Sequence, residues 1–401
     1  MGAIEIEKDL KNLPIFFTRG KHDLFKVLSE KTRIYQKIIL AISFFTTEIW
    51  EIIELVLDIK QAFGKKVLIV AGGPHPTGDP LGTLKMGINI VIVGEGEETF
   101  IELIKALNNG ENIQNIKGIA LFDENNEYVY TGRRKPIDLN KYPLLPTKNI
   151  RFGALEITRG CPFACSFCQT SFIFGTTPRH RDIDKICNAV KFMARYNKTD
   201  IRFITPNAFS YGSKDGKELN VELVEKLLIK IKTIIGHNGR IFFGSFPSEV
   251  RPEHVCDDTL KLVKKYANND NIVIGAQTGS EKLLKFCNRG HSVEDIYNAV
   301  ENITKYGLKA YVDFIFCLPG EDEDDVDLTI KLMNDLIKLG AKIHGHIFIP
   351  LPGTPFAKSK IKKITSNFKT LIMNLNYKGV LFGDWKKQEE LALKISRYYQ
   401  T

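Results

Sequence analysis

Short apolar runs recur along this chain, and each ends in glycine, proline or polar residues. In the first third the runs cover residues 38–43, 66–70 and 88–93. Apolar residues at helical spacing occupy 48–62 between the first two runs, and a second helix is expected over about 97–107. Strands that alternate with helices predict an α/β fold built on a parallel, doubly wound sheet.

The length and composition agree with a globular protein of several domains. A chain of 401 residues suggests two or three domains, and 43% hydrophobic with 26% charged residues excludes a disordered, collagen-like or coiled-coil chain. The longest apolar stretch, 38–45, is about half of what a bilayer requires. The amino terminus lacks a basic segment followed by an apolar one, so we expect no secretory signal and a cytoplasmic location.

The net charge of +9 is dispersed over the chain rather than gathered in a basic run. A basic surface can attract nucleic acid or an acidic protein, but dispersed charge favours an ordinary solvated surface, and we expect no nucleic-acid partner. The chain has seven cysteines. In a cytosolic protein these are ligands or buried thiols more often than disulfides.

Two glycine-rich segments follow the second and third apolar runs. They read Gly72-Gly73-Pro74-His75-Pro76-Thr77 and Gly94-Glu95-Gly96-Glu97-Glu98-Thr99. Ligands of doubly wound sheets bind at this edge, where glycine lets backbone amides approach a flat or anionic group. Turns that need a positive φ would give the same glycines, so both interpretations stay open.

The paired motif, over about residues 35–110, resembles the cobalamin-binding domains that precede radical S-adenosylmethionine (SAM) domains. The segment lacks the Asp-x-His-x-x-Gly motif whose histidine coordinates cobalt from below. The resemblance therefore implies a cobalamin without a histidine beneath the cobalt, or a degenerate domain that has lost the cofactor. The residues implied to bind cobalamin are Ser43, Thr46, Gly72, Gly73, Pro74, His75, Gly94, Glu95, Gly96 and Glu97.

Three of the seven cysteines, Cys161, Cys165 and Cys168, crowd into eight positions. Structural zinc would need a fourth cysteine or histidine nearby, and none follows at a suitable spacing. A [4Fe–4S] cluster also normally takes four thiolates. Three thiolates would leave one iron open to a substrate or cofactor, so the pattern itself indicates a functional site.

Cys-x-x-x-Cys-x-aromatic-Cys at the end of a strand resembles the signature of the radical SAM superfamily. In that family SAM chelates the open iron and is cleaved to a 5′-deoxyadenosyl radical, which abstracts hydrogen from carbon. Further strands are expected over 200–207, 240–252, 271–280, 310–320 and 343–349, with polar residues at their exits. The resemblance implies a partial (β/α)6 barrel of the TIM type.

Several strand exits resemble the family's SAM contacts, although any one of these residues could equally serve as a cap or turn. They are Asn207, Ser248, Glu249, Arg251, Gln277, Ser280 and Arg289. Asp313 is expected at the barrel mouth, and His346 alternates with His344 on one strand face. We predict Asp313 and His346 as catalytic residues that orient the substrate, and Cys317 as a small apolar filler.

The predicted domains are a Rossmann-like cobalamin-binding domain at 1–140, a linker at 141–150 that contains Pro143 and Pro146, a radical SAM barrel at 151–355, and a helical extension at 356–401. The resemblance implies a cobalamin-dependent methyltransferase acting on an unactivated sp3 carbon, with a peptide of the methyl-coenzyme M reductase α subunit as the favoured substrate. It also implies a low-potential electron donor such as ferredoxin or flavodoxin.

Three alternatives to this function stay open. One is a radical SAM oxidoreductase or rearrangement enzyme that acts on a small metabolite or lipid. Another is a sensor of cobalamin or SAM without catalysis, against which the three intact cysteines argue. Methylthiotransfer to tRNA is disfavoured, because those enzymes carry three further cysteines and none precedes Cys161 here.

Overall fold

The computed structural model describes residues 1–399. The chain divides into two compact units, each taken by itself below. One comprises Met1–Ile137 with Leu351–Gly353, and the other comprises Asp138–Pro350 with Thr354 onward.

The first unit is built on a five-stranded sheet with the order β1-β2-β3-β4-β5. The first three strands are parallel, as predicted, and Ser43 at the end of β1 pairs with Gly72 at the end of β2. The last two strands run antiparallel to their neighbours, which corrects the expectation of an all-parallel sheet. The strands are β1 (Ile38–Ser43), β2 (Val67–Gly72), β3 (Ile90–Ile92), β4 (Ile119–Phe122) and β5 (Tyr128–Tyr130).

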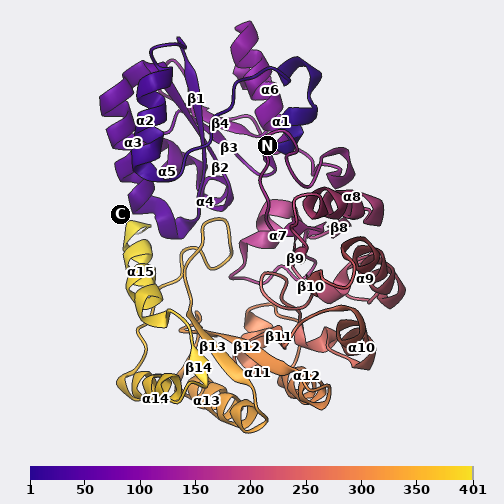
Figure 1. Ribbon diagram of the computed structural model, residues 1–401. Coiled ribbons are helices and arrows are strands. Elements are labelled where there is room, and N and C mark those ends of the chain that lie inside the picture. Colours follow the sequence, from indigo (N-terminus) through magenta and orange to yellow (C-terminus); the bar gives the residue numbers. More distant parts are fainter. Residues whose placement is uncertain (400–401) are drawn as a thin grey trace. The chain divides into compact units, whose positions relative to one another are not determined.

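Helices cover both faces of this sheet. Helices α2 and α3 lie on one side, and α1 and α6 lie on the other (Figure 1). Strands β2 and β3 are accordingly buried along nearly their whole length rather than in alternation. The helices are α1 (Gly2–Ile6), α2 (Gly20–Lys31), α3 (Ile49–Phe63), α4 (Pro74–Gly78), α5 (Pro80–Lys85) and α6 (Gly96–Asn109).

The second unit repeats strand and helix around a partial barrel. Strands β6, β9 and β10 form one parallel sheet, and β11 to β14 form another. Between β10 and β11 in the chain, Val250 forms an isolated parallel bridge with Ile274 of β11. The strands are β6 (Leu155–Glu156), β7 (Thr158–Arg159), β8 (Arg179–His180), β9 (Asp200–Ile204), β10 (Arg240–Phe242), β11 (Asn271–Gln277), β12 (Lys309–Phe316), β13 (Lys342–Ile347) and β14 (Leu381–Phe382).

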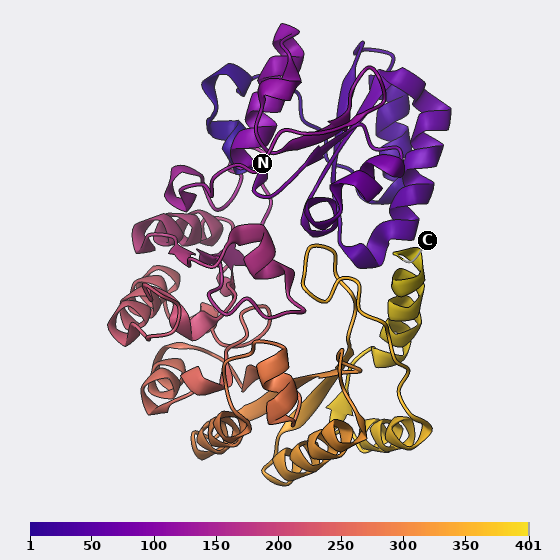
Figure 2. The ribbon, with the colours of Figure 1, turned by 180° about the vertical axis from the view of Figure 1, so that it is seen from behind.

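Helices α8, α9, α10, α12 and α13 lie on the outer side of these strands (Figure 2). The parallel strands confirm the predicted barrel architecture, and β7 and β8 add a small antiparallel pair beside the first strand. The helices are α7 (Gln169–Phe174), α8 (Ile183–Ala194), α9 (Val221–Ile235), α10 (Asp257–Tyr266), α11 (Glu281–Phe286), α12 (Val293–Lys305), α13 (Glu323–Lys338), α14 (Ser366–Tyr377) and α15 (Trp385–Tyr398).

Strand β12 shows how this fold separates its core from its inner face. Val312 and Phe314 are fully buried in the core. Tyr311 and Asp313 alternate with them, lie on the opposite face and are only half-buried. The inner face of the barrel is therefore the place where polar side chains can meet a ligand.

The segment after residue 356 differs in one respect from the predicted helical extension. It contains the helices α14 and α15, but between them β14 pairs in parallel with β13 and extends the barrel sheet. Across the described residues, none of the helices is both long enough and apolar enough to cross a membrane.

Candidate functional site

The three clustered cysteines lie on one loop, residues 160–168, which we call the thiol loop. Cys165 is buried, while Cys161 and Cys168 are half-buried. The loop begins at Gly160, whose φ is +87°, and a Cβ added there would lie 2.2 Å from the Thr177 carbonyl oxygen. Only glycine permits this close approach of the backbone.

The thiol loop is held by backbone and hydroxyl hydrogen bonds. The Cys161 amide donates to the Gly175 carbonyl at 3.1 Å, and the Ser171 hydroxyl donates to the Cys161 carbonyl at 2.8 Å. The Thr170 amide lies 3.4 Å from the Cys168 sulfur and donates to it.

The spacing of the three sulfurs differs from that of a mononuclear zinc site. Zinc–sulfur bonds of about 2.3 Å at tetrahedral angles place thiolates about 3.8 Å apart. Among the described residues, the three cysteines do not form a set of ligand atoms that all lie within 4.8 Å of one another. A wider spacing fits the larger cluster, whose irons each take one thiolate.

The fourth nearby cysteine, Cys287, is not equivalent to these three. Its carbonyl accepts the Ser166 amide at 2.9 Å, so it packs against the thiol loop. Burial raises the pKa of the Cys287 thiol to about 12, and the same cause raises the pKa of Cys317 to about 12. Both therefore remain protonated, and Cys317 lies in the core as the predicted filler.

Two buried arginines lie beside the thiol loop. Arg289 places Nη1 3.6 Å from the Cys165 sulfur and donates through Nη2 to the Gly275 carbonyl at 2.6 Å. Arg251 pairs with Glu253, donates to the Arg289 carbonyl and lies 3.4 Å above the Phe163 ring. The two guanidinium groups carry more positive charge than the single carboxylate of Glu253 neutralises.

This arginine cluster contains an unpaired donor and an unpaired acceptor. Arg289 Nε and Glu253 Oε2 are both buried without a hydrogen-bond partner among the described residues. An anion would satisfy the first and a cation the second. The amino-acid end of SAM carries both charges, so these side chains fit it.

The other predicted SAM contacts are placed in different ways. The Asn207 amide contacts His254 and accepts from the Arg251 backbone amide at 3.4 Å, which brings Asn207 into the arginine cluster. Gln277 has a φ of +78° at an irregularity of β11, a strained conformation for a side chain other than glycine. Glu249 is half-buried, and burial raises the pKa of its carboxyl.

Two of the predicted contacts have hydroxyls that are already hydrogen-bonded within the protein. Ser248 is fully buried and donates to the Ser245 carbonyl at 2.9 Å. Ser280 caps α11 by accepting the Leu283 amide and donates to Asp325 at 2.6 Å. Their structural roles account for these hydroxyls, and a role in binding SAM stays a prediction.

The two predicted catalytic residues come together through a third. His344 Nδ1 lies 3.0 Å from Asp313 Oδ1 and 3.1 Å from His346 Nε2. Burial lowers the pKa of His346, so the imidazole is neutral near pH 7. The set Asp313, His344 and His346, here called the inner triad, joins β12 to β13.

Sequence reasoning missed several members of these clusters. Glu253, His254 and His291 line the arginine cluster, and Gln388 contacts the inner triad from α15. The His-Ser that follows Arg289-Gly290 was a usable signal for His291. No local pattern pointed to Gln388, which is distant in the chain.

In the first unit, Gly72, Gly73 and Gly94 form what we call the glycine edge, at the carboxyl ends of β2 and β3. Gly73 has a φ of +94°, and a Cβ there would lie 2.3 Å from the Ser43 hydroxyl. Gly94 has a φ of +85° and faces open space, because a Cβ there would meet nothing within 4 Å. Its amide donates to the Thr77 hydroxyl at 3.1 Å.

His75 lies fully buried beside the glycine edge. Its ring packs on Phe44 with centroids 5.2 Å apart, and its Nδ1 lies 3.2 Å from the hydroxyl of Thr46. Burial lowers the pKa of His75 to about 4, so the ring is neutral. Its Nε2 has no hydrogen-bond partner among the described residues.

The glycine edge and this unpaired nitrogen fit a large group with polar edges, such as cobalamin. The remaining predicted residues follow the same loops: Pro74 begins α4, Glu95 accepts the Ile137 amide at 2.8 Å, and Gly96 and Glu97 open α6.

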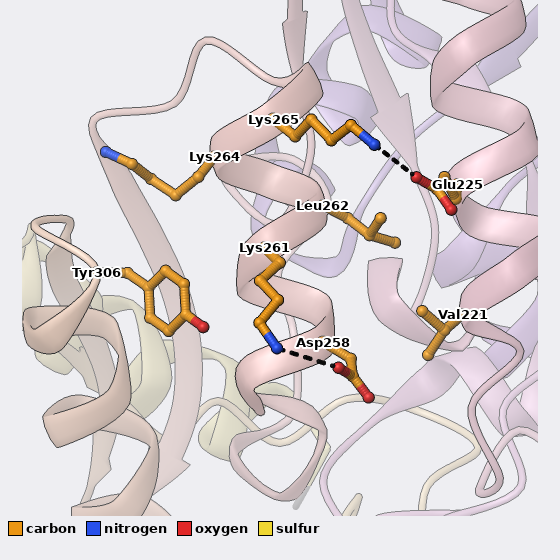
Figure 3. Close-up of a pocket in the computed structure, with 8 residues that line it drawn as sticks. All are labelled: Val221, Glu225, Asp258, Lys261, Leu262, Lys264, Lys265 and Tyr306. Atoms are coloured by element: carbon orange, nitrogen blue, oxygen red, sulfur yellow. Dashed lines mark hydrogen bonds and ion pairs between the residues drawn. The ribbon is translucent and has the colours of Figure 1, made fainter.

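A separate hollow of about 620 Å³ lies on the outer helices of the second unit (Figure 3). Lys265 pairs with Glu225 across it, and Lys261 pairs with Asp258 along α10. Its lining comes from α9, α10 and the residue after α12, and it contains none of the residues predicted for the site.

Comparison with known proteins finds a family match within each unit. Residues 155–333 match the model of the radical SAM superfamily, and residues 29–104 match that of the B12-binding domain. An uncharacterized methyltransferase of Pyrococcus horikoshii is 28% identical over 75% of this chain and 64% of its own length. A Methanocaldococcus jannaschii protein named as a methylthiotransferase is 30% identical over 69% of this chain and 60% of its own length.

The fold resembles that of a solved radical SAM methyltransferase, TsrM from Kitasatospora setae, whose structure has a tryptophan substrate and a SAM analogue bound. The TM-score is 0.67 at 17% identity, covering 84% of this chain and 67% of that one. At that identity the likeness concerns the fold. The chain spans less than two thirds of either relative named above.

Proposed function

The chain belongs to the radical SAM superfamily and carries a B12-binding domain, and from this premise we propose that it is a methyltransferase acting on an unactivated sp3 carbon. The observation that carries the proposal is the presence, in one chain, of a three-thiol loop and a glycine edge. When bound, the cluster and SAM supply a hydrogen-abstracting radical, and cobalamin supplies a methyl group.

In this proposal the protein's own side chains bind and orient the cofactors. Cys161, Cys165 and Cys168 hold the cluster and leave one iron open for SAM. Arg289 and Glu253 bind the charged groups of its amino-acid end through their unpaired Nε and Oε2 atoms. The glycine edge receives cobalamin without a histidine beneath the cobalt.

Asp313 and His346 orient the substrate in the proposed reaction. They lie on the inner face of the barrel, where Asp313 offers a carboxylate and His346 a neutral imidazole. A carboxylate attracts a cationic group, and an imidazole can donate or accept a hydrogen bond. Together they can fix the target group while the core of the barrel excludes water.

For the substrate we propose a peptide carbon in the α subunit of methyl-coenzyme M reductase. The support is the resemblance to methanogen proteins, together with a net charge of +9 that would help to hold an acidic protein. The electron donor is a small ferredoxin or flavodoxin, and the location is the cytoplasm.

The test is an anaerobic assay with SAM, methylcobalamin, a low-potential reductant and candidate peptides. We expect equal amounts of 5′-deoxyadenosine and S-adenosylhomocysteine, with a mass gain of one CH2 group on the peptide. Sustained 5′-deoxyadenosine formation without S-adenosylhomocysteine, in the presence of a converted substrate, would refute methyl transfer and favour an oxidation or rearrangement.

A further inference from the structure

The inner triad presents three ligand atoms on one face of the barrel sheet. Asp313 and His344 are partners across β12 and β13, and His346 follows two residues later on the same face. Among the described residues, these three form the set of His, Cys, Asp or Glu ligand atoms that all lie within 4.8 Å of one another. All three side chains are half-buried rather than sealed in the core.

The hydrogen bonds of this triad cannot all form with one proton on each imidazole. Gln388 accepts the Ile347 amide through Oε1 at 2.9 Å, which turns its Nε2 donor toward His346 Nδ1 at 3.4 Å. His346 must then carry its proton on Nε2, which lies 3.1 Å from His344 Nδ1.

That arrangement makes His344 Nδ1 an acceptor, because a ring nitrogen holds either one proton or one lone pair. The same nitrogen lies 3.0 Å from Asp313 Oδ1, a carboxylate oxygen that needs a donor. Moving the proton of either ring repairs one contact and breaks another. The three atoms therefore lack a proton that would allow both contacts of His344 Nδ1 to be hydrogen bonds while Gln388 keeps its own.

A metal ion resolves this conflict, because it requires lone pairs on all three atoms. Bonds of about 2.1 Å place neighbouring ligand atoms about 3.0 Å apart in an octahedron and about 3.4 Å apart in a tetrahedron. The two separations that involve His344 Nδ1, 3.0 Å to Asp313 Oδ1 and 3.1 Å to His346 Nε2, match this range. We propose that Asp313 Oδ1, His344 Nδ1 and His346 Nε2 bind a divalent transition-metal ion, distinct from the iron–sulfur cluster.

The charge around the triad also favours a cation. Burial is the main cause that raises the pKa of the Glu249 carboxyl. The charge of Asp313 also raises it, while His344 acts in the opposite direction. Within the described residues, Asp313 pairs with His344, and no lysine or arginine forms an ion pair with either carboxylate. A divalent ion would neutralise both carboxylates.

The imidazole of His344 is held in place before any ion arrives. Its ring stacks on Phe382 with centroids 4.5 Å apart and planes 9° apart. A Cβ on the following residue, Gly383, would lie 3.2 Å from the His344 ring. A rigid ligand loses little conformational freedom when it binds a metal.

The ligand set indicates which metals and substrates the site would take. Two imidazoles and one carboxylate suit zinc, iron(II) or a similar first-row ion, and they leave coordination positions open. A substrate oxygen or nitrogen can fill these positions. With Nε2 bound to a metal, His346 would carry its proton on Nδ1, and Gln388 would have to release the Ile347 amide and turn its amide oxygen toward His346 to accept that proton.

The test uses the full chain with its iron–sulfur cluster installed, so that the cysteines are occupied. After dialysis against zinc, we expect one zinc per chain, and zinc X-ray absorption should show a shell of nitrogen and oxygen without sulfur. His346→Ala or Asp313→Asn should weaken zinc binding at least tenfold, while His237→Ala, at an exposed histidine, should leave it unchanged.

Iron content and circular dichroism of each variant serve as the check on folding. The proposal is overturned if no zinc is retained, if sulfur appears in the shell, or if a variant lacking all three ligands binds zinc as the wild type does. The first result would mean that the triad shares protons instead. Because zinc binding is measured without turnover, its outcome is independent of whether the chain transfers methyl groups.

Discussion

Replacing Gly94 by leucine tests whether the glycine edge receives cobalamin. Leucine at a φ of +85° costs roughly 1–2 kcal/mol of backbone strain, and its side chain would extend into the open space that now faces Gly94. If a corrin occupies that space, the side chain should weaken cobalamin binding at least 100-fold, about 2.7 kcal/mol.

Gly110 provides a matched control for this experiment. It has a φ of +71°, and a Cβ there would also meet nothing within 4 Å, but it ends α6 away from the glycine edge. Gly110→Leu should therefore reproduce the strain without blocking the cofactor. Cobalamin binding is measured by equilibrium dialysis and absorbance, and stability by chemical unfolding of the cofactor-free proteins. Equal affinities for cobalamin in the two variants would refute the assignment of the glycine edge.

Four further outcomes are expected. Changing Cys161, Cys165 and Cys168 together to alanine should abolish iron binding after anaerobic reconstitution, and full iron content in that variant would contradict the thiol loop as the cluster site. Arg289→Lys should weaken SAM binding at least tenfold at unchanged iron content, because lysine lacks the Nε donor that is now unpaired; unchanged binding by dialysis would argue against this contact. The Co(II) form of bound cobalamin should show no axial nitrogen splitting in electron paramagnetic resonance, and a splitting would mean that a histidine lies beneath the cobalt. Burial raises the pKa of Glu321 to about 7, above its value in the unfolded chain, so the neutral carboxyl stabilises the fold at low pH and this stability is lost as pH rises from about 4.5 through 7. Glu321→Gln should remove this loss, which is worth about 3 kcal/mol at most. If the free energies of unfolding of the wild type and the variant depend on pH in parallel, the expectation is wrong.

Much of the strand order could be predicted from local patterns. The run 38–43 became β1, and the helix expected at 48–62 became α3, Ile49–Phe63. These elements follow from apolar periodicity over neighbouring residues, which is a local property. The reversal at β4 and β5 was not predicted, because the direction of a strand depends on its pairing partner and not on its own sequence.

In the candidate site too, the features that depend on neighbouring residues were predictable, and those that depend on distant residues were not. The thiol loop was predictable because its three cysteines lie within eight residues of one another. The arginine cluster was predicted only in part. Glu253 was missed because its place in the cluster depends on Arg251 and Arg289, which the fold brings together although they are far apart in the chain. Whether the serines bind SAM could not be decided from sequence, because the hydrogen bond of Ser280 to Asp325 joins residues 45 positions apart.

The inner triad shows why a pairing between strands carries chemical information that a single strand does not. His344 and His346 were visible as an alternation, but their meaning depends on the register that sets Asp313 opposite His344. It depends also on β14, a two-residue strand that places Phe382 against the His344 ring, and on Gln388 in the helix that follows. A one-residue shift of β13 against β12 would turn both imidazoles into the core, where unpaired polar groups are costly. The same register that keeps these side chains on the inner face thus creates the proton deficit from which the metal site is inferred.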